Sequence, residues 1–241
     1  MLLPIAGKPL VLHTVERAIS AKNVARVIVA TDDRRIFDAV TEARFEAQMT
    51  SAEHRSGSDR IAEVAESLPE GSIIVNVQGD EPVLPAGTID AAVSALVGDH
   101  GADIATTFEP ISEIRDVVDP NIVKVVTDAN GDAMYFSRSP VPYPREAVMR
   151  HGSIEAALAA EPSLVSTFKK HTGIYVYRRE YLLKFTKFAP TPLETAEMLE
   201  QLRALETGAA IKVVAAAGES IGVDTEADLE RVRAMFAAAE E

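Results

Sequence analysis

IIVNVQGDEP, residues 73–82, decides the fold: an apolar, β-branched run ends abruptly on two carboxylates and a proline. The run over 73–77 has the composition of a buried strand. In an open α/β sheet, ligands bind just outside the carboxyl ends of the strands, where Asp80 and Glu81 would lie. Taken alone, residues 79–82 favour a plain surface turn, because Gly, Asp and Pro are turn residues. A second carboxylate near the same sheet edge would favour a ligand site instead.

Short apolar runs alternate with amphipathic segments along the rest of the chain. This alternation is typical of an α/β protein with a mostly parallel sheet and helices on both faces. No Gly/Ser-rich or Pro-rich linker interrupts it, so residues 1–241 are interpreted as a single domain. The predicted strands are 26–30, 73–77, 103–107, 122–126, 171–177 and 211–215, and the predicted helices are 9–21, 34–46, 59–68, 86–97, 193–206 and 225–238.

Composition excludes several classes of function. The formal net charge of the 241 residues is -13, which disfavours nucleic acid as a partner because like charges repel. The chain has no cysteine, so disulfides, thiolate catalysis and zinc-thiolate sites are excluded. No apolar run reaches the ~20 residues of a membrane helix, and the N-terminus does not resemble a secretion signal. We therefore expect a cytoplasmic protein without a membrane partner.

The second carboxylate is Asp224, which follows the strand predicted over 211–215 and precedes the last helix. Thr225 with Asp228 three residues later forms a capping-box pattern, so Asp224 is either a neighbour of a helix cap or part of a site. Paired with Asp80 across the strand ends, it would complete a two-carboxylate metal site. Mg²⁺ prefers oxygen ligands and keeps substrate phosphates in its shell, which suits such a pair.

Residues 53–60, EHRSGSDR, precede the helix predicted over 59–68. Ser56, Gly57 and Ser58 offer backbone N–H groups beside a helix N-terminus, which is a ready cradle for an anion or a nucleotide. The same residue types also make an ordinary helix cap. The segment is therefore a weak signal until it is combined with others.

Seven motifs together resemble the 3-deoxy-manno-octulosonate (Kdo) cytidylyltransferase family, also called CMP-Kdo synthetase. The resemblance runs from about residue 11 to residue 233, with the motifs in the family's order. The motifs are EHRSGSDR (53–60), VNVQGDEP (75–82), NIVKVV (121–126), YFSRSPVPYPR (135–145), HTGIYVYRREYL (171–182), TPLETAEMLEQLRALE (191–206) and GVDTEADLERVR (222–233).

The resemblance implies a fold, a reaction and a cofactor. The fold is the Rossmann-like nucleotide-diphospho-sugar transferase sheet with a small dimerisation region, and the protein would be a homodimer. The reaction transfers CMP from CTP to the anomeric hydroxyl of Kdo, giving CMP-Kdo and pyrophosphate for lipopolysaccharide biosynthesis. Mg²⁺ is the implied cofactor, because metals stabilise the charge on transferring phosphates.

The resemblance also assigns metal and nucleotide residues. Asp80 and Asp224 become the Mg²⁺ ligands, and Ser56, Gly57, Ser58 and Arg60 become the nucleotide-side loop. Gln78 would hold the nucleotide or the sugar. Arg60 is otherwise a solvated helix residue, and Gln78 is otherwise a polar residue at the end of a strand.

The sugar-side residues come from two segments and one arginine. His171 and Tyr175 share a strand face, which is either the sugar-acid pocket or core packing. Glu194, Glu197 and Gln201 form a stripe on the helix predicted over 193–206, which would bind Kdo hydroxyls or face solvent; Met198, Leu202 and Leu205 form its core stripe. Arg138 is assigned to catalysis, because its planar fork suits a carboxylate or a phosphate, or else to a structural ion pair.

The chain departs from the family pattern at its beginning. Gly7-Lys8-Pro9 matches the family's second GKP, and the first strand and basic phosphate loop that precede it are absent. Lys8 is therefore not assigned to the phosphates. A start set too late, a shortened chain and true loss are the alternatives, and a missing strand would expose sheet edges. CMP-sialate-type transfer and a non-catalytic binding protein remain as alternative functions.

Overall fold

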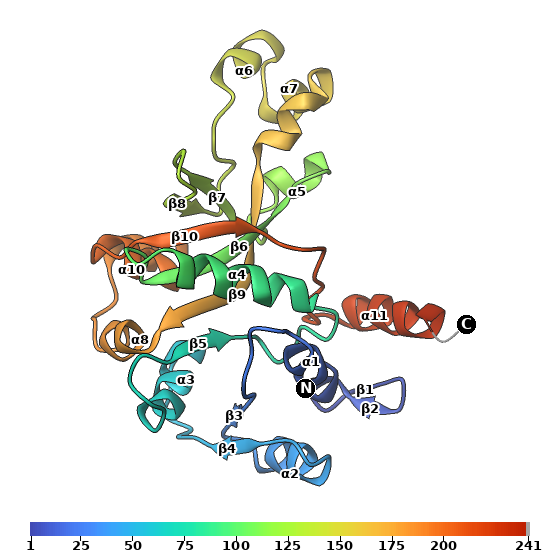
Figure 1. Cartoon of the computed structure of the whole chain (residues 1–241). Helices are drawn as coiled ribbons and strands as arrows, with labels where there is room; N and C mark the ends of the chain where they lie inside the picture. Colours follow the sequence, from blue (N-terminus) through green and yellow to red (C-terminus); the bar gives the residue numbers. More distant parts are fainter. Residues whose placement is uncertain (240–241) are drawn as a thin grey trace.

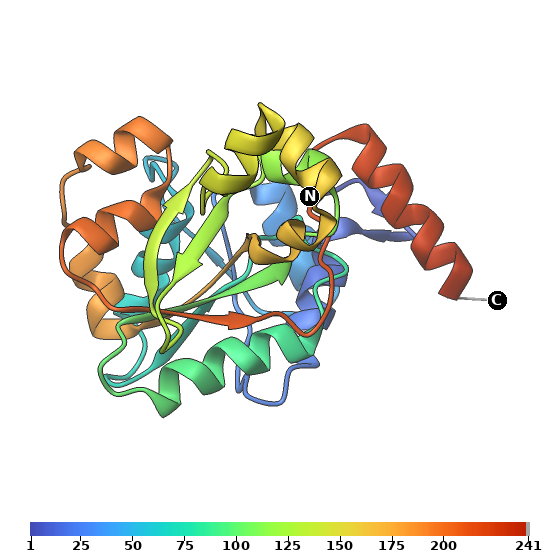
Figure 2. The same ribbon diagram turned by 90° about the horizontal axis from the view of Figure 1, so that it is seen from above.

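The computed structural model describes residues 1–239, and its centre is a six-stranded mixed sheet (Figures 1 and 2). The long strand β9 pairs antiparallel with β6, β5 and β7, whereas β10 runs parallel to β6. β5, β6, β7 and β10 therefore all point in one direction, opposite to β9. The strands of this sheet are β5 (Ile73–Asn76), β6 (Ile104–Pro110), β7 (Lys124–Thr127), β8 (Ala133–Ser137), β9 (Lys169–Arg178) and β10 (Ile211–Ala215).

Two small sheets lie apart from the central one. β1 (Pro4–Ile5) and β2 (Lys8–Pro9) form a short antiparallel hairpin, and β3 (Val29–Thr31) pairs parallel with β4 (Ala47–Met49). A cavity of about 610 Å³ separates β3 from β5, and mostly apolar side chains line it. Within residues 1–239, β3 pairs only with β4 and β5 only with β9. Both strands thus have an unpaired edge.

Helices cover both faces of the central sheet. Their bounds are α1 (Leu10–Ile19), α2 (Arg34–Glu42), α3 (Gly57–Glu66), α4 (Ala86–Gly98), α5 (Ile114–Val118), α6 (Arg145–His151), α7 (Ile154–Ala160), α8 (Arg179–Phe185), α9 (Pro192–Glu197), α10 (Glu200–Glu206) and α11 (Glu226–Ala239), with a 3₁₀ turn over Pro162–Thr167. None of the helices described in residues 1–239 has both the length and the apolar character needed to cross a bilayer.

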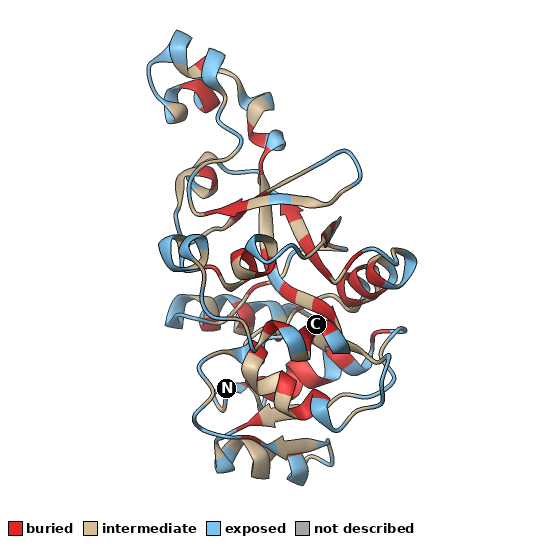
Figure 3. Cartoon of the chain, turned by 90° about the vertical axis from the view of Figure 1, so that its left-hand side faces the viewer, coloured by how far each residue is buried: buried red, intermediate tan, exposed pale blue. Residues whose placement is uncertain are grey.

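Alternating residues of β9 divide the core into two layers, because successive strand side chains point to opposite faces. Ile174 and Val176 pack in the cluster that includes α4. Tyr175 and Tyr177 pack in the cluster built on α3, α8 and α10. The buried residues in Figure 3 accordingly follow the central strands and the inner sides of the helices. β9 is therefore the strand around which both halves of the core are organised.

An arm projects from the end of the sheet and carries α6, α7 and the 3₁₀ turn (Figure 1). Leu158, Val165 and Phe168 are buried in a small cluster of their own, which Ile111 and Val117 complete. Met149 and Tyr143 are exposed on the arm by 76% and 59%. The arm therefore has a core of its own and leaves large apolar side chains on its surface.

The predicted single helix over 193–206 is wrong. The structure has α9 and α10 in its place, and Met198 between them takes a left-handed conformation with φ 52°. Met198 is 80% exposed, so it does not join the predicted core stripe, whereas Leu202 is buried. The break also separates Glu194 and Glu197 from Gln201, which therefore do not form one stripe.

Candidate active site

The segments that carry Asp80 and Asp224 lie side by side at the end of β5. The backbone N–H of Val223 donates to the carbonyl oxygen of Asp80 over 2.9 Å. On the other side of the turn, the Thr14 hydroxyl donates to the carbonyl oxygen of Gly79 over 2.8 Å. The fold therefore brings together two carboxylates that are 144 positions apart in the sequence, from 80 to 224.

The pKa of Asp80 is affected by the proximity of Asp224. Burial raises the pKa of its carboxyl above the ordinary value, and the nearby charge of Asp224 raises it further. The N-terminal ammonium group of Met1 acts in the opposite direction. A carboxylate whose ionisation a neighbouring carboxylate opposes forms a site that a cation stabilises, since an opposite charge favours its ionised form.

This donor set fits Mg²⁺. Within residues 1–239, no group of three or more His, Cys, Asp or Glu side chains is placed to hold a metal ion. Mg²⁺ does not need such a group, because it is usually bound by one or two carboxylates together with waters and substrate phosphates. Asp80 and Asp224 would therefore suffice as protein ligands if a nucleoside triphosphate supplied the phosphate oxygens.

The N-terminus of α3 lies next to the same turn. Ser56 is the helix cap, and its side-chain oxygen accepts from the backbone N–H of Asp59 over 3.1 Å. A Cβ atom at Gly57 would lie 3.8 Å from the Gln78 amide nitrogen, so the loop and the strand end are neighbours. Gln78 itself is exposed. The predicted nucleotide residues Ser56, Gly57 and Gln78 are thus close together.

Ser58 and Arg60 have partners within the protein. Ser58 is buried, and its hydroxyl donates to Glu200 Oε2 over 2.6 Å. Arg60 Nη1 donates to Thr50 Oγ1 over 2.6 Å and lies 3.2 Å from Asp32 Oδ1. Ser58 therefore anchors α3 to α10, and Arg60 is held beside the ends of β3 and β4 instead of being a solvated residue.

His171 and Tyr175 lie on one face of β9, in contact at 5.3 Å between ring centroids. The Thr106 hydroxyl donates to the carbonyl oxygen of Ile174 over 2.7 Å, so its oxygen accepts from His171 Nε2 over 2.9 Å. Burial lowers the pKa of His171 to about 3. The ring is therefore neutral near pH 7, with the proton on Nε2 and a free acceptor at Nδ1.

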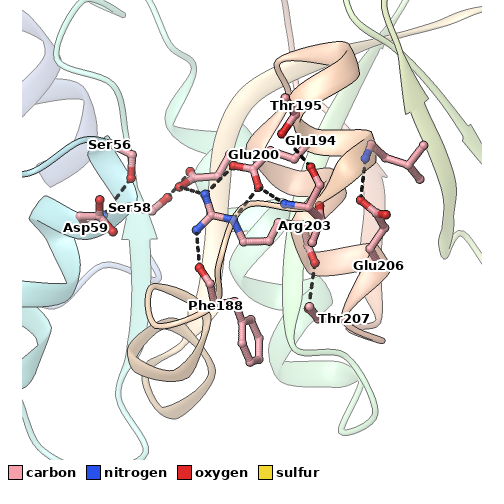
Figure 4. A network of polar contacts seen from close by, with 12 residues as sticks. Ser56, Ser58, Asp59, Phe188, Glu194, Thr195, Glu200, Arg203, Glu206 and Thr207 are labelled. Carbon is pink, nitrogen blue, oxygen red and sulfur yellow. Dashed lines mark hydrogen bonds and ion pairs between the residues drawn. The ribbon is translucent and has the colours of Figure 1, made fainter.

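An arginine organises the segment that was predicted to bind sugar hydroxyls, as Figure 4 shows. Arg203 Nε donates to Glu194 Oε2 over 2.7 Å, and Nη2 pairs with the other oxygen of the same carboxylate. Glu194 also closes a capping box with Thr191 at the start of α9. Glu200 lies 3.8 Å from Arg203 and bonds Ser58, so the network joins α3, α9 and α10.

Glu197 and Gln201 differ in their surroundings. Glu197 accepts from the Ser137 hydroxyl over 2.7 Å and from the backbone N–H of Arg138 over 2.9 Å. Gln201 is buried, with 7% of its surface exposed. Glu194 and Glu197 are thus both engaged by protein groups, which favours a role in building the site over one in direct contact with the sugar.

The contacts of Arg138 also favour a structural role. Its guanidinium donates to the carbonyl oxygens of Glu197 over 2.7 Å and of Pro120 over 2.9 Å. Beside it, the buried Lys124 donates to the carbonyl oxygens of Asp119, Ile122 and Arg138 over 2.7–2.9 Å. The predicted catalytic role of Arg138 stays a prediction.

Sequence reasoning missed a polar group behind the carboxylate pair. Ser220 is held by Glu81 and Glu109, and Glu109 is paired with Lys170. The quoted stretch 73–82 contains Glu81, but its partners lie on three other segments, and no local spacing connects them. No signal in the sequence was available for this group, because the burial of its members is evident only in the folded chain.

The 610 Å³ cavity between β3 and β5 is not this site. Its lining contains none of the predicted site residues, although it includes their sequence neighbours Ile61, Val77 and Gly79. Lys8, which has no predicted role, forms a surface ion pair with Glu16 at 2.6 Å. The candidate site residues therefore lie at the strand ends and along β9, outside the lining of the cavity.

Comparison with known proteins identifies relatives of the whole chain. The family model described as Cytidylyltransferase matches residues 1–213. The 3-deoxy-manno-octulosonate cytidylyltransferase of Geobacter metallireducens is 48% identical over 231 residues, covering 96% of this chain and 89% of that protein. The protein of the same name from Geotalea daltonii is 49% identical over 231 residues, again covering 96% of this chain and 89% of the relative.

Solved structures confirm the predicted fold. A CMP:2-keto-3-deoxy-manno-octonic acid synthetase complexed with CTP matches with a TM-score of 0.85 and 38% identity, over 99% of this chain and 91% of that one. A 4-diphosphocytidyl-2C-methyl-D-erythritol synthase from Anaerococcus prevotii matches with a TM-score of 0.59 and 12% identity, over 97% of this chain and 88% of that one. The second likeness extends to the fold alone.

Proposed function

The chain belongs to the 3-deoxy-manno-octulosonate cytidylyltransferase family, and we propose that its reaction takes place at the strand-end site formed by Asp80 and Asp224. The activity is that of a CMP-Kdo synthetase, EC 2.7.7.38: CTP and Kdo give CMP-Kdo for lipopolysaccharide biosynthesis. Pyrophosphate is the second product, because the α-phosphate of CTP is transferred to the anomeric hydroxyl of Kdo.

The observation that carries this proposal is the contact between the two carboxylate segments. The Val223 N–H bond to Asp80 fixes the spacing of the two segments, and the charge of Asp224 raises the pKa of Asp80. Asp80 and Asp224 would hold Mg²⁺, which supplies charge neutralisation for the α-phosphate and the departing pyrophosphate. The residues themselves contribute by fixing where the phosphates lie.

The nucleotide lies beside the N-terminus of α3 in this proposal. The backbone N–H groups of Gly57 and Ser58 suit a phosphate or the carbonyl oxygen of cytosine, whereas the N–H of Asp59 is taken by Ser56. Gln78 faces the same loop and offers both a donor and an acceptor. Arg60 lies one turn further along α3, where its positive charge favours an anionic ligand.

The sugar acid lies along β9. His171 presents a free Nδ1 acceptor, and the Tyr175 ring lies against it. Burial raises the pKa of Tyr175 well above its ordinary value, so its hydroxyl keeps its proton and can donate to a sugar oxygen. Gln201 completes the polar groups, while Glu194 and Glu197 hold the segment in shape.

The test is pyrophosphate release by the 241-residue chain with CTP, Mg²⁺ and Kdo. Asp80→Ala and Asp224→Ala are each expected to lower the rate by roughly 10²-fold or more, since each removes a charge that holds the metal. Asp38→Ala is the matched control, because Asp38 lies in an exposed i,i+4 pair with Arg34. Equal rates with Kdo and a sialic acid would instead support the CMP-sialate type, and silence of the wild-type chain would support a binding protein without catalysis.

Three further proposals concern the whole protein. We propose a homodimer that meets through the arm, because Met149 and Tyr143 are exposed there. We propose a cytoplasmic location, because CTP is a cytoplasmic substrate. We propose that residues 1–241 form one domain, because the core clusters share β9. Light scattering tests the homodimer, cell fractionation tests the location, and the number of unfolding transitions tests the single domain.

A further inference from the structure

Ser220 is held between two carboxylates behind the proposed metal site. Its hydroxyl donates to Glu81 Oε2 over 2.5 Å, and its backbone N–H donates to Glu109 Oε1 over 2.9 Å. The second oxygen of Glu109 accepts from Lys170 Nζ over 3.1 Å. We call these four residues, Glu81, Glu109, Lys170 and Ser220, the Ser220 bracket.

The bracket joins four separate segments. Lys170 lies near the start of β9, and Glu109 lies near the end of β6. Glu81 follows Asp80 directly in the turn after β5, and Ser220 lies four residues before Asp224. Each proposed metal ligand is therefore within four residues of the bracket, and the two strands that form the middle of the sheet support it.

The segment that carries Asp224 has few other polar contacts. From Gly218 to Asp224, its hydrogen bonds to the rest of the described protein are the two at Ser220 and the one from Val223 to Asp80, apart from an exposed pair between Glu219 and Arg231. Apolar packing of Ile221 and Val223 in the cluster with Ile5 and Leu10 also holds the segment. Two of its three hydrogen bonds to the sheet and the Asp80 turn thus belong to the bracket, and removing them would leave one hydrogen bond and this packing.

The two carboxylates of the bracket also cost more desolvation free energy than a purely structural contact needs. Glu109 is 8% exposed and Glu81 is half-buried, and of the two carboxylates only Glu109 has an ion pair among the described residues, with Lys170. Buried carboxylates are retained where they fix a geometry, since apolar residues would give the same stability at lower cost in desolvation. Here the geometry that they fix is the position of Ser220.

We propose that Glu81 is a positioning residue that acts through Ser220 to set the spacing of Asp80 and Asp224. The inference rests on the proposed function, because it takes that pair as the metal site. Glu81 itself does not bind the metal. The two adjacent carboxylates of residues 79–82 then have separate tasks: Asp80 faces the ligand, and Glu81 faces the bracket.

The experiment measures Mn²⁺ binding by electron paramagnetic resonance in the presence of CTP, with melting temperature as the second readout. Glu81→Ala and Ser220→Ala are each expected to weaken Mn²⁺ binding about tenfold, and the double variant no more than either alone, because they remove one contact. Glu81→Gln is expected to stay within about threefold of wild type, since an amide oxygen still accepts from the Ser220 hydroxyl. Glu219→Gln, an exposed carboxylate on the same segment, is the control and is expected to bind as wild type.

The variants separate the outcomes. Wild-type Mn²⁺ affinity in both Glu81→Ala and Ser220→Ala overturns the inference, and Ser220→Ala alone decides if Glu81→Ala does not fold. Equal losses in Glu81→Gln and Glu81→Ala with none in Ser220→Ala would make Glu81 a direct ligand, which also overturns it. Wild-type affinity in Asp80→Ala would remove the proposed metal site itself. Asp80→Ala losing Mn²⁺ while Glu81→Ala keeps it would remove the positioning role only.

Discussion

Replacing Arg203 by methionine should destabilise the protein by about 3–5 kcal/mol, the usual cost of removing one partner of a buried ion pair. Only 11% of the Arg203 side chain and 13% of the Glu194 side chain are exposed, so the pair is well shielded from water. Methionine fills the space of the arginine stem, which limits loss of packing. The remaining loss comes from leaving the Glu194 carboxylate without its charge partner.

Urea unfolding at pH 7 measures this loss in the free energy of unfolding. In a thermal unfolding experiment, the expected fall in melting temperature is roughly 6–20 °C for a chain of this size. Arg34→Met is the matched control, because Arg34 is 74% exposed and pairs with Asp38 on the surface; its expected loss is below about 0.5 kcal/mol. Adding Glu194→Gln to Arg203→Met should recover about 1–2 kcal/mol, because glutamine keeps the capping contact and removes the unpaired charge. Equal losses in Arg203→Met and Arg34→Met would refute the reasoning.

The ion pair between Arg203 and Glu194 should also make the stability of the protein depend on pH. Arg203 holds the pKa of Glu194 below its ordinary value of 4.5. A carboxyl whose pKa is lowered by folding stabilises the protein above its unfolded pKa and loses that contribution as the pH falls through its folded pKa. The difference in stability between wild type and Arg203→Met should therefore be full above about pH 4.5 and shrink below it.

Three other measurements test separate features. His171 should stay neutral from pH 5 to 8 in an NMR titration, because burial lowers its pKa to about 3; a midpoint near 6.5 would contradict the enclosed ring. Met198→Gly should unfold no more easily than wild type and gain up to about 1 kcal/mol, whereas Met198→Val should lose about 1 kcal/mol or more, because φ is 52° there; equal stabilities in urea would argue against the left-handed break. Lys124→Met should cost about 3 kcal/mol or more in urea unfolding, because three carbonyl oxygens lose their donor; a loss under 1 kcal/mol would contradict that.

Local sequence patterns were sufficient for five of the six strands of the central sheet and for the helices α1 to α4 and α11, whereas β8 and the short helices α5 to α8 were not predicted. The run over 73–77 and the alternation in 171–177 are visible because strands have a period of two and buried strands are β-branched. The break at Met198 was not predictable, because residues 193–206 keep a helical pattern throughout. The chain stops the helix there through tertiary contacts: Arg203, on α10, holds Glu194, on α9.

The candidate site was predictable in its residues and not in its contacts. Asp80 and Asp224 follow strands, so their meeting at one sheet edge follows from topology. Whether a polar side chain is free for a ligand depends on partners far away in sequence. Arg138 is bound to carbonyl oxygens of Pro120 and Glu197, and Ser58 is bound to Glu200, 142 positions away. No spacing rule gives such pairs.

The cavity between β3 and β5 has a consequence for how the molecule opens. Without main-chain hydrogen bonds across it, β3, β4 and α2 are joined to the central sheet through side chains and through the connecting chain. Such a unit opens at a lower free energy than the sheet built on β9, so its amide protons exchange with solvent first. Each opening presents two free strand edges at once, and a strand of a second molecule can pair with either. The stability of β3, β4 and α2 should therefore limit how long the protein stays monomeric at high concentration, although none of the proposed site residues lies in these three elements.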